Sequence, residues 1–214
     1  MSNIESVPYP SIRRFPSYLQ VIRNFKKTGI KTISSSDIAR ELGLTNIQVR
    51  KDIGFTGIIG KPKIGYEIEE LEDIIMESLG WHNIHDAFLV GVGALGSALL
   101  GYDGFTEYGL NIAAGFDTDK KKVGKEIHGK KIFSVTDLPG LVDRMKVTIG
   151  ILTVPRAYAQ ETADLMINAG IKAIWNFSSE RLRVPDTVVV QRENLSSSLA
   201  LLSVKLSQKI KISS

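Results

Sequence analysis

The apolar positions of the first 80 residues follow the spacing of helices. Between residues 11 and 29 an apolar stripe recurs every three or four positions, at Phe15, Leu19, Ile22 and Phe25. The stripe predicts a helix that holds Pro16 in its first turn, where proline is tolerated, and that ends before Gly29. Residues 1–10 contain two prolines and few apolar anchors, so we expect a loose arm there.

Two shorter helices are predicted next. The stretch SSSDIARELGL has a serine cap, an aspartate in its first turn and a stop at Gly43. Thr45 and Gln48 have the spacing of a capping box, so Thr45 can cap a third helix over roughly 46–53. Two helices joined by a tight turn that contains glycine form a helix-turn-helix.

The segment that follows predicts a wing. Its β-forming residues alternate with glycines at 57, 60 and 65, which is typical of a short hairpin. The acidic amphipathic stretch 69–80 then predicts a connector helix. We therefore expect residues 1–80 to form a winged helix-turn-helix domain.

Beyond residue 80 the pattern changes to alternating strands and helices. Strands are predicted near 86–91, 111–117, 131–135, 146–153, 171–176 and 187–191. This alternation predicts an α/β domain over 81–192 with a Rossmann-like, doubly wound parallel sheet. A last apolar stripe, at Leu195, Leu199, Leu202, Leu206 and Ile210, predicts a C-terminal helix within 193–214.

Charge is distributed unevenly along the 214 residues. Residues 1–66 carry 11 Lys and Arg against 4 Asp and Glu, a net charge of +7, whereas the remainder carries 16 against 19, a net charge of −3. A basic N-terminal part indicates either an anionic partner such as nucleic acid or a solvated basic face, and charge alone does not separate the two. The chain has no cysteine, which excludes disulfides and thiolate sites.

Neither a membrane span nor a leader segment is expected. The longest uncharged run, 87–102, is glycine-rich and shorter than the ~20 apolar residues that a membrane span needs. The first residues lack the apolar core of a signal peptide. We therefore expect a cytoplasmic protein.

The turn after the first strand of the α/β domain has the spacing of a dinucleotide site. Gly91, Gly93 and Gly96 form G-x-G-x-x-G between an apolar strand and a helix. They permit a tight turn, a close approach to a pyrophosphate and close packing of helix on strand, while the helix N-terminus favours the phosphates. Asp117 ends the second strand 21 residues later, the spacing of a ribose-binding acid, which favours NAD(H) over NADP(H). The alternative is a glycine turn that binds nothing, and we expect the lysines at 120–122 to be solvated.

The third predicted helix presents polar groups of the kind that read DNA. Val49 and Ile53 are four residues apart and can face the small core. The groups expected to face outward are Gln48, Arg50 and Lys51 on the helix, with Lys61 and Lys63 at the tip of the wing. Such a helix fits the major groove, and such a wing can reach the minor groove or the phosphates. The alternative is a small helical domain with a charged surface.

Together these segments resemble one family, the Rex redox-sensing transcriptional repressors. The resemblance extends from Ile12 to the C-terminal helix. Its markers are QVRKD at 48–52, the glycine-rich wing ending in Gly65-Tyr66, GVGALG at 91–96, FDTD at 116–119, LTVPRAYAQ at 152–160 and NF at 176–177.

The resemblance implies a homodimer whose winged domains bind a palindromic, double-stranded operator when NADH is low and which NADH releases. It also implies that the C-terminal helix is swapped onto the partner subunit. The residues expected to bind NAD(H) are Gly91, Val92, Gly93, Ala94, Leu95, Gly96, Tyr102, Asp117, Thr153, Val154, Pro155 and Asn176. Those expected to bind DNA are Thr45, Gln48, Arg50, Lys51, Lys61 and Lys63.

Some positions differ from the family pattern. Pro62 stands where the wing usually carries arginine. Gln20 and Asn194 stand where many Rex proteins carry an arginine and an aspartate, which act with a tyrosine matched here by Tyr102. Leu195 replaces an aromatic residue. In WNFSS, the NF marker stands in a sequence context where the family usually has small residues before it. These differences predict that NADH binding is kept while its effect on DNA binding is weakened.

Two other classes of protein compete with this interpretation. A small NAD-dependent dehydrogenase needs a general acid or base beside the nicotinamide. The histidines are His82 and His85, before the first predicted strand, and His128, in a predicted surface turn, so we expect neither a catalytic residue nor a metal site. A nucleotide-binding regulator without DNA binding would leave the helix-turn-helix and the basic N-terminal part unexplained.

Overall fold

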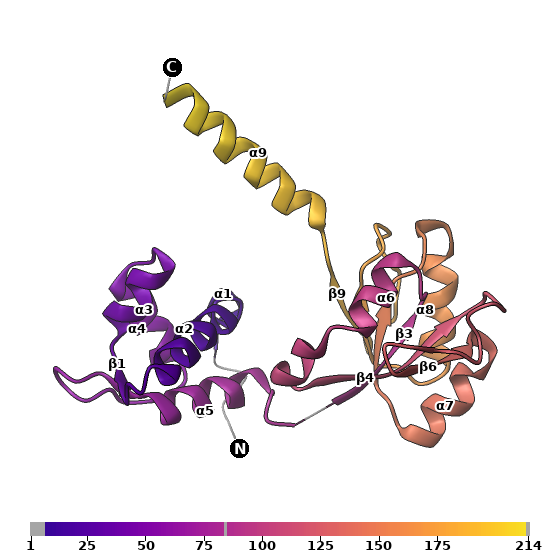
Figure 1. The fold of residues 1–214 in the computed structure, drawn as a ribbon, viewed down its shortest axis with the longest axis horizontal. Helices are drawn as coiled ribbons and strands as arrows, with labels where there is room; N and C mark the ends of the chain where they lie inside the picture. Colours follow the sequence, from indigo (N-terminus) through magenta and orange to yellow (C-terminus); the bar gives the residue numbers. More distant parts are fainter. Residues whose placement is uncertain (1–6, 84, 213–214) are drawn as a thin grey trace. The chain divides into compact units, whose positions relative to one another are not determined.

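The computed structural model describes residues 7–83 and 85–212, so most of the predicted N-terminal arm lies outside the described residues. The chain divides into two compact units, Met1–Asn83 and Ile84–Ser214, which we call the winged unit and the sheet unit (Figure 1). Each unit has its own apolar core, and each is described by itself below.

The winged unit is built from helices and one short antiparallel strand pair. Its elements are α1 (Tyr9–Ile12), α2 (Phe15–Lys27), β1 (Thr32–Ile33), α3 (Ser35–Leu42), α4 (Asn46–Gly54), β2 (Tyr66–Glu67) and α5 (Ile68–Leu79). The apolar stripe of α2 is confirmed, because Phe15, Leu19 and Ile22 are fully buried. Helix α1 begins at Tyr9, so the expected arm is helical at its last two residues.

Side-chain caps delimit the helix-turn-helix. Helix α3 starts with a capping box between Ser34 and Asp37 and ends at Gly43, which has a left-handed backbone. Thr45 caps α4 as predicted, since its hydroxyl oxygen accepts from the Gln48 N–H at 3.3 Å. The reciprocal pair of bonds expected at Thr45 forms at α3 instead.

The wing pairs differently from the hairpin that the glycine pattern predicted. Strand β2 pairs with β1, which precedes the helix-turn-helix in the sequence, and Ile33 lies opposite Tyr66. Between α4 and β2 the wing itself has one bridge, Lys61 to Gly65. A Cβ on Gly65 would lie 2.4 Å from the Ile33 carbonyl oxygen, so glycine is required where the wing passes β1.

The described part of the sheet unit contains one sheet of seven strands. These are β3 (His85–Val90), β4 (Leu110–Asp117), β5 (Glu126–Ile127), β6 (Lys130–Ser134), β7 (Ile149–Leu152), β8 (Ala173–Asn176) and β9 (Val189–Arg192), in the spatial order β5-β6-β4-β3-β7-β8-β9. All neighbours are parallel except β5 and β6. The doubly wound sheet is therefore as predicted, and β5 is an additional edge strand.

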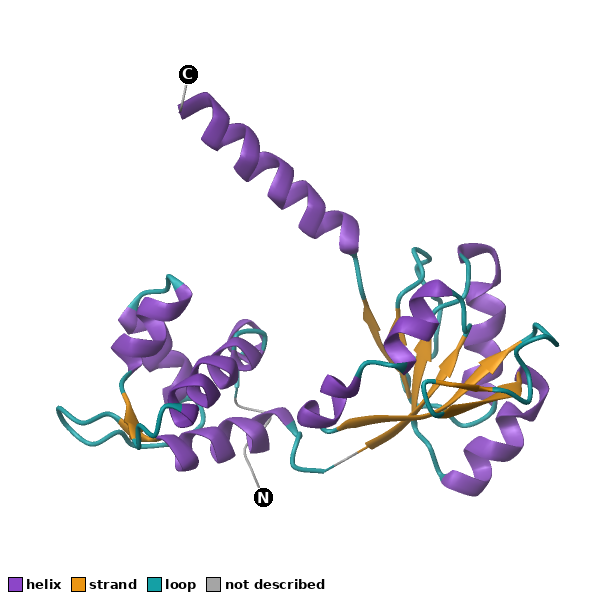
Figure 2. Cartoon of the chain, in the orientation of Figure 1, coloured by secondary structure: helices purple, strands orange, loops and turns teal. Residues whose placement is uncertain are grey.

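Helices cover both faces of this sheet (Figure 2). They are α6 (Ala94–Leu100), α7 (Leu138–Met145) and α8 (Ala159–Asn168), with short 3-10 turns η2 (Asp103–Tyr108), η3 (Val135–Asp137) and η4 (Arg156–Tyr158). Along β3, Phe88 and Val90 pack in the core that contains α7 and α8, whereas Ala87 and Leu89 pack in the core that contains the end of α6. This two-residue alternation is that of a strand buried on both faces.

The C-terminal helix α9 (Leu195–Ile212) exposes apolar side chains. Those of Leu199, Leu201, Leu202, Val204 and Leu206 are each more than half exposed. Within the described ranges, no helix, α9 included, is long and apolar enough to cross a membrane.

Candidate dinucleotide site and nucleic-acid interface

The register of the sheet brings the ends of four parallel strands to one level. Val90 of β3 pairs with Phe116 of β4 on one side and with Leu152 of β7 on the other, and Leu152 pairs with Asn176 of β8. The residues that follow β3 and β7, and the last residue of β4, therefore lie along one edge. The chain order reverses on either side of β3, which is where ligands bind in open α/β sheets.

In the turn after β3, two glycines are required sterically and the third leaves open space. Gly91 has φ +101°, and a Cβ there would lie 2.8 Å from a methyl of Val154. A Cβ on Gly96 would lie 2.1 Å from the Gly91 carbonyl oxygen. Gly93, in contrast, has nothing within 4 Å of a Cβ position, so its outer side is open to a phosphate. Ala94 and Leu95 follow in the first turn of α6, which has no side-chain cap on its free N–H groups.

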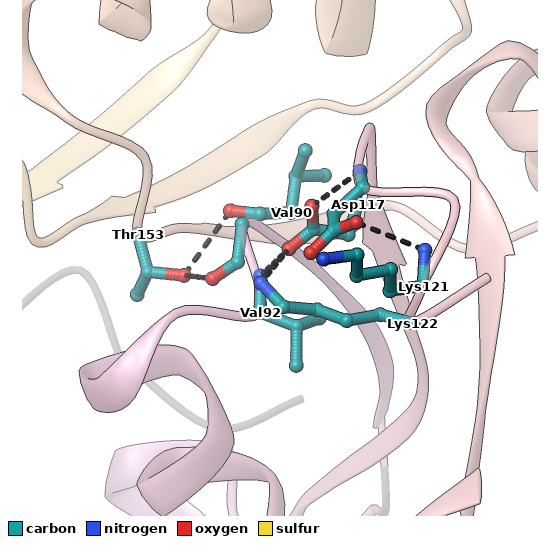
Figure 3. A network of polar contacts seen from close by, with 8 residues as sticks. Val90, Val92, Asp117, Lys121, Lys122 and Thr153 are labelled. Atoms are coloured by element: carbon teal, nitrogen blue, oxygen red, sulfur yellow. Dashed lines mark hydrogen bonds and ion pairs between the residues drawn. The ribbon is translucent and has the colours of Figure 1, made fainter. Parts of the chain in front are cut away.

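Asp117 closes the other side of this turn (Figure 3). Its Oδ2 accepts from the Val92 N–H at 2.9 Å, its Oδ1 accepts from the Asp119 N–H at 2.8 Å, and Lys122 Nζ lies 3.1 Å from Oδ2. Burial would raise the pKa of the Asp117 carboxyl, but the Asp119 N–H, the Lys122 ammonium and the Val92 N–H together hold that pKa below its ordinary value. The site therefore presents an ionised acceptor.

The residues after β7 and β8 shape the wall of the site through bonds to the protein. Thr153 Oγ1 donates to the Gly91 carbonyl at 2.7 Å and so fixes the glycine turn. Asn176 is fully buried; its Oδ1 accepts from the N–H and hydroxyl of Ser178, and its amide donates to the Glu180 carbonyl. Pro155 directly precedes η4. The side chains of Thr153 and Asn176 are therefore engaged in hydrogen bonds that hold these loops.

Tyr102 lies at the other end of α6 from the glycine turn. It is half-exposed, and its ring meets Phe105 edge-on at 4.8 Å between centroids. Phe105 in turn contacts Trp175, whose indole N–H donates to Glu193 at 2.7 Å, two residues before α9. Tyr102 is therefore separated from the glycine turn by the length of α6, whereas its ring contacts lead to Trp175, the neighbour of Asn176 in β8.

The residues expected to bind DNA lie on the outer surface of the winged unit. Along α4, Val49 and Ile53 are fully buried, as predicted. The exposed residues are Thr45, Asn46, Ile47, Arg50 and Lys51 on and before α4, with Lys61 and Lys63 in the wing, and Gln48 is partly buried. Lys61 is paired with Glu67 at 2.9 Å, which offsets part of its charge. Lys63 has a left-handed backbone, φ +64°, at the tip of the wing.

The buried face of α4 carries a charge that the sequence reasoning did not single out. Asp52 is 3% exposed and accepts bonds from Arg14 at 2.7 and 2.8 Å, from the Tyr18 hydroxyl at 2.6 Å and from the Ser11 hydroxyl at 2.8 Å. Burial would raise the pKa of Asp52, but these donors, Arg14 first, lower it. The same contacts raise the pKa of Arg14, and burial raises the pKa of Tyr18.

Asp52 and Lys122 differ in how clearly the sequence indicated their positions. Asp52 stands three residues after Val49 and one before Ile53, so the helical period already places it on the buried face. Lys122 gave no such signal. The expectation that the lysines at 120–122 are solvated is wrong for Lys122, whose side chain is 33% exposed and paired with Asp117, because the turn after β4 folds back over the strand end.

The histidines form no metal site in the described part of the chain. His82 Nε2 bonds the Asp73 carbonyl, and His128 occupies the turn between β5 and β6 against Gly101. Among the described residues no group of three or more His, Asp and Glu side chains could hold a metal ion.

Two family models match the chain, one in each unit. A model described as a CoA binding domain matches residues 82–180. A model described as a putative DNA-binding protein N-terminus matches residues 6–53. The split between them agrees with a nucleotide site in the sheet unit and a DNA-binding surface in the winged unit.

Named relatives match almost the whole chain. The redox-sensing transcriptional repressor Rex of Treponema denticola is 50% identical over 200 residues, covering 94% of this chain and 95% of the relative. Rex of Bacteroides thetaiotaomicron is 40% identical and covers 94% of this chain and 91% of the relative.

Solved structures agree with these relatives. RSP, a Rex-family repressor, in complex with β-NAD⁺ and operator DNA, is 34% identical with a TM-score of 0.87, covering 97% of this chain and 95% of RSP. RSP in complex with β-NADH is 34% identical with a TM-score of 0.86, covering 97% of each chain.

Proposed function

The chain belongs to the Rex family of redox-sensing transcriptional repressors, and we propose that it binds operator DNA and is released from it by NADH. One observation carries this proposal. A protein with the same fold over 97% of this chain has been crystallised with operator DNA and NAD⁺ together, and also with NADH. The family acts as regulators of transcription, and the chain is accordingly not an enzyme.

The winged unit is the proposed DNA reader. Arg50 and Lys51 project from the exposed side of α4, whose inner side is fixed by Val49 and Ile53. A helix presented in this way fits the major groove, where Arg bonds guanine and Gln bonds adenine. Gln48, which is partly buried, carries the amide proposed for that second contact. We propose that the wing, with Lys63 at its tip, contacts the phosphates or the minor groove.

The edge of the sheet at Gly91, Gly93 and Asp117 is the proposed NAD(H) site. The open side of Gly93 supports contact with the pyrophosphate, and the ionised Asp117 supports acceptance of a bond from the 2′-hydroxyl of the adenosine ribose. NADH and NAD⁺ share these groups, so this edge should hold both. Discrimination must come from the nicotinamide ring, which is charged in NAD⁺ and neutral in NADH.

We propose a homodimer, which the exposed apolar face of α9 supports. Five apolar side chains there are more than half exposed, among them Leu199, Leu202 and Leu206, and a partner subunit would cover them. Two winged units related by a two-fold axis match a palindromic operator. A repressor that acts on chromosomal DNA in bacteria works in the cytoplasm, where we place this protein.

The switch requires a difference in affinity between two states. NADH can release the operator only if it binds the non-binding conformation better than the DNA-binding one, with a coupling free energy of ~1–3 kcal/mol in typical cases. Gln20 is exposed, and Asn194 accepts bonds from Ser196 and Ser197 at the start of α9. Neither carries the charge that many Rex proteins have there. We propose that transmission is therefore weaker than in those proteins.

An operator titration tests the proposal. Palindromic duplexes selected from a random library by the full-length protein would be titrated at several ratios of NADH to NAD⁺, at one stated salt concentration. We expect the apparent Kd for DNA to rise as NADH replaces NAD⁺. Failure to select any sequence, or DNA affinity that is independent of NADH, would contradict the proposed function.

A further inference from the structure

Lys122 reaches the carboxylate that is proposed to hold the adenosine ribose. Its Nζ lies 3.1 Å from Asp117 Oδ2, and its side chain is one-third exposed (Figure 3). The two preceding lysines of the same turn, Lys120 and Lys121, are exposed instead. Of these three lysines, Lys122 is therefore the one whose ammonium pairs with Asp117.

The contacts of Asp117 leave limited capacity for a ligand. An ionised carboxylate offers about four acceptor positions. Three are occupied, by the Val92 N–H, the Asp119 N–H and the Lys122 ammonium. A ribose hydroxyl that donates to this carboxylate must therefore take the remaining position or displace Lys122, and in either case it lies next to the ammonium.

The charges of Asp117 and Lys122 also offset each other. A 2′-phosphate in place of the 2′-hydroxyl would meet the carboxylate, which repels it, and the ammonium, which attracts it. Lysine is a phosphate-binding residue when its ammonium is free. Here the ammonium is held by Asp117, and the backbone donors of Val92 and Asp119 hold Asp117.

We propose that Lys122 is a second specificity-determining residue of the dinucleotide site. It is a phosphate-binding group kept in an ion pair by Asp117, and it binds the 2′-phosphate of NADP(H) once the carboxylate charge is removed. In the unaltered protein Lys122 also limits how strongly Asp117 can reject NADP(H). This inference rests on the proposed function, because it concerns the ribose of the same cofactor.

The test compares NADH and NADPH binding to full-length variants by calorimetry. We expect Asp117→Asn to raise NADPH affinity about tenfold relative to NADH, the size of one hydrogen bond to a charged group. Adding Lys122→Met should remove that gain. Adding Lys121→Met instead is the matched control, because it removes the same charge from an exposed neighbour, and the gain should remain. Lys122→Met alone should increase the preference of the protein for NADH.

The outcomes separate the inference from the proposed function. A gain in NADPH affinity that survives Lys122→Met, or that Lys121→Met removes equally, would overturn the role of Lys122. If Asp117→Asn does not fold, the ratio of NADH to NADPH affinity in Lys122→Met decides, and an unchanged ratio would overturn the role. Unaltered protein that binds NADPH but not NADH would contradict the proposed function and leave Lys122 as a phosphate ligand. Binding of neither would overturn both.

Discussion

The carboxylate of Asp52 lies on the inner side of α4, where Arg14, Tyr18 and Ser11 all donate to it. Ser11 lies in α1, Tyr18 lies in α2, and Arg14 is the N-cap residue of α2. The network therefore ties the orientation of the proposed DNA-reading helix to the N-terminal helices. A buried ion pair adds little net stability, but loss of one partner leaves the other charge uncompensated.

We expect Asp52→Asn to lower the free energy of unfolding of the winged unit by about 3 kcal/mol, because Arg14 would lose its counter-charge. Chemical denaturation of the full-length protein measures this. Glu69→Gln is the matched control, since Glu69 is exposed and lies 3.9 Å from Lys26, and it should change stability by less than about 0.5 kcal/mol. Equal effects of the two variants would contradict the role of Asp52.

The same residue predicts a pH dependence. The pKa of Asp52 is lower in the folded protein than its ordinary value of 3.8. Its contribution to stability is therefore fully present above that ordinary value and is lost as pH falls below it, through the folded pKa. Between pH 5 and pH 2 the unaltered protein should lose more stability than Asp52→Asn does. Parallel losses would show that other carboxylates dominate acid unfolding.

At the scale of elements, α4 is proposed to make two kinds of contact with DNA, one with phosphates and one with base edges. Replacing a lysine that contacts phosphate weakens binding to all sequences and lowers the salt slope by about one unit for each contact. Replacing a residue that reads a base costs ~1–3 kcal/mol at one base pair. We expect Lys51→Ala to behave mainly in the first way and Arg50→Ala in the second. Competition binding at several salt concentrations distinguishes them.

A control for this experiment comes from the other helix of the same helix-turn-helix. Arg40 of α3 is exposed but paired with Asp37 at 2.8 Å, so Arg40→Ala removes an equal charge outside α4. Operator affinity that falls as much for Arg40→Ala as for Arg50→Ala would indicate a general charge effect. Unchanged affinity of the Arg50 and Lys51 double variant would show that α4 is not the reader.

The elements that the sequence predicted well are those whose stability is local. The apolar periods of α2 and α5 and the cap at Thr45 are all visible in neighbouring residues. The two-residue strands β1 and β5 were missed, because strands so short carry no period and form through a distant partner. Pairing of β2 with β1 depends on contact across the helix-turn-helix, as Gly65 shows.

The same division holds for the candidate site. The glycine turn and Asp117 follow from spacing, because strand ends converge at one edge of a parallel sheet. The ion pair of Lys122 with Asp117 depends on how the turn after β4 folds back, and no local pattern encodes it. Asn176 was predicted from the family resemblance, yet its buried bonds to Ser178 and Glu180 became visible only in the structure.

At the scale of the whole molecule, assembly is the first consequence of α9. Deleting residues 193–214 removes its exposed apolar side chains, so we expect monomers with weak operator affinity, because a two-fold operator needs a two-fold protein. Light scattering during size exclusion measures the mass. As a control, Ser203→Ala with Ser207→Ala alters two hydroxyls that donate to backbone carbonyls of α9 itself and should leave the dimer intact. A truncated chain that remains dimeric would contradict the swap.

Coupling between the winged unit and the sheet unit can also be tested at this scale. Restoring both charges, Gln20→Arg with Asn194→Asp, should steepen the NADH response of operator binding while NADH affinity stays within a few fold, because neither residue belongs to the glycine edge. Titration of DNA binding against NADH measures this. Each single variant serves as a control, since one charge without its partner should give little gain. A flat response in the double variant would show that these positions do not carry the signal.

Trp175 gives the molecule an optical reporter of its own. It is one of two tryptophans; its ring contacts those of Phe105 and Phe177, and its indole N–H donates to Glu193, two residues before α9. The fluorescence of an indole depends on its hydrogen bond and on the polarity around it. The other tryptophan, Trp81, packs against the core of the winged unit. In a Trp81→Phe background, the fluorescence of Trp175 would report changes at the start of α9 in solution without an attached dye.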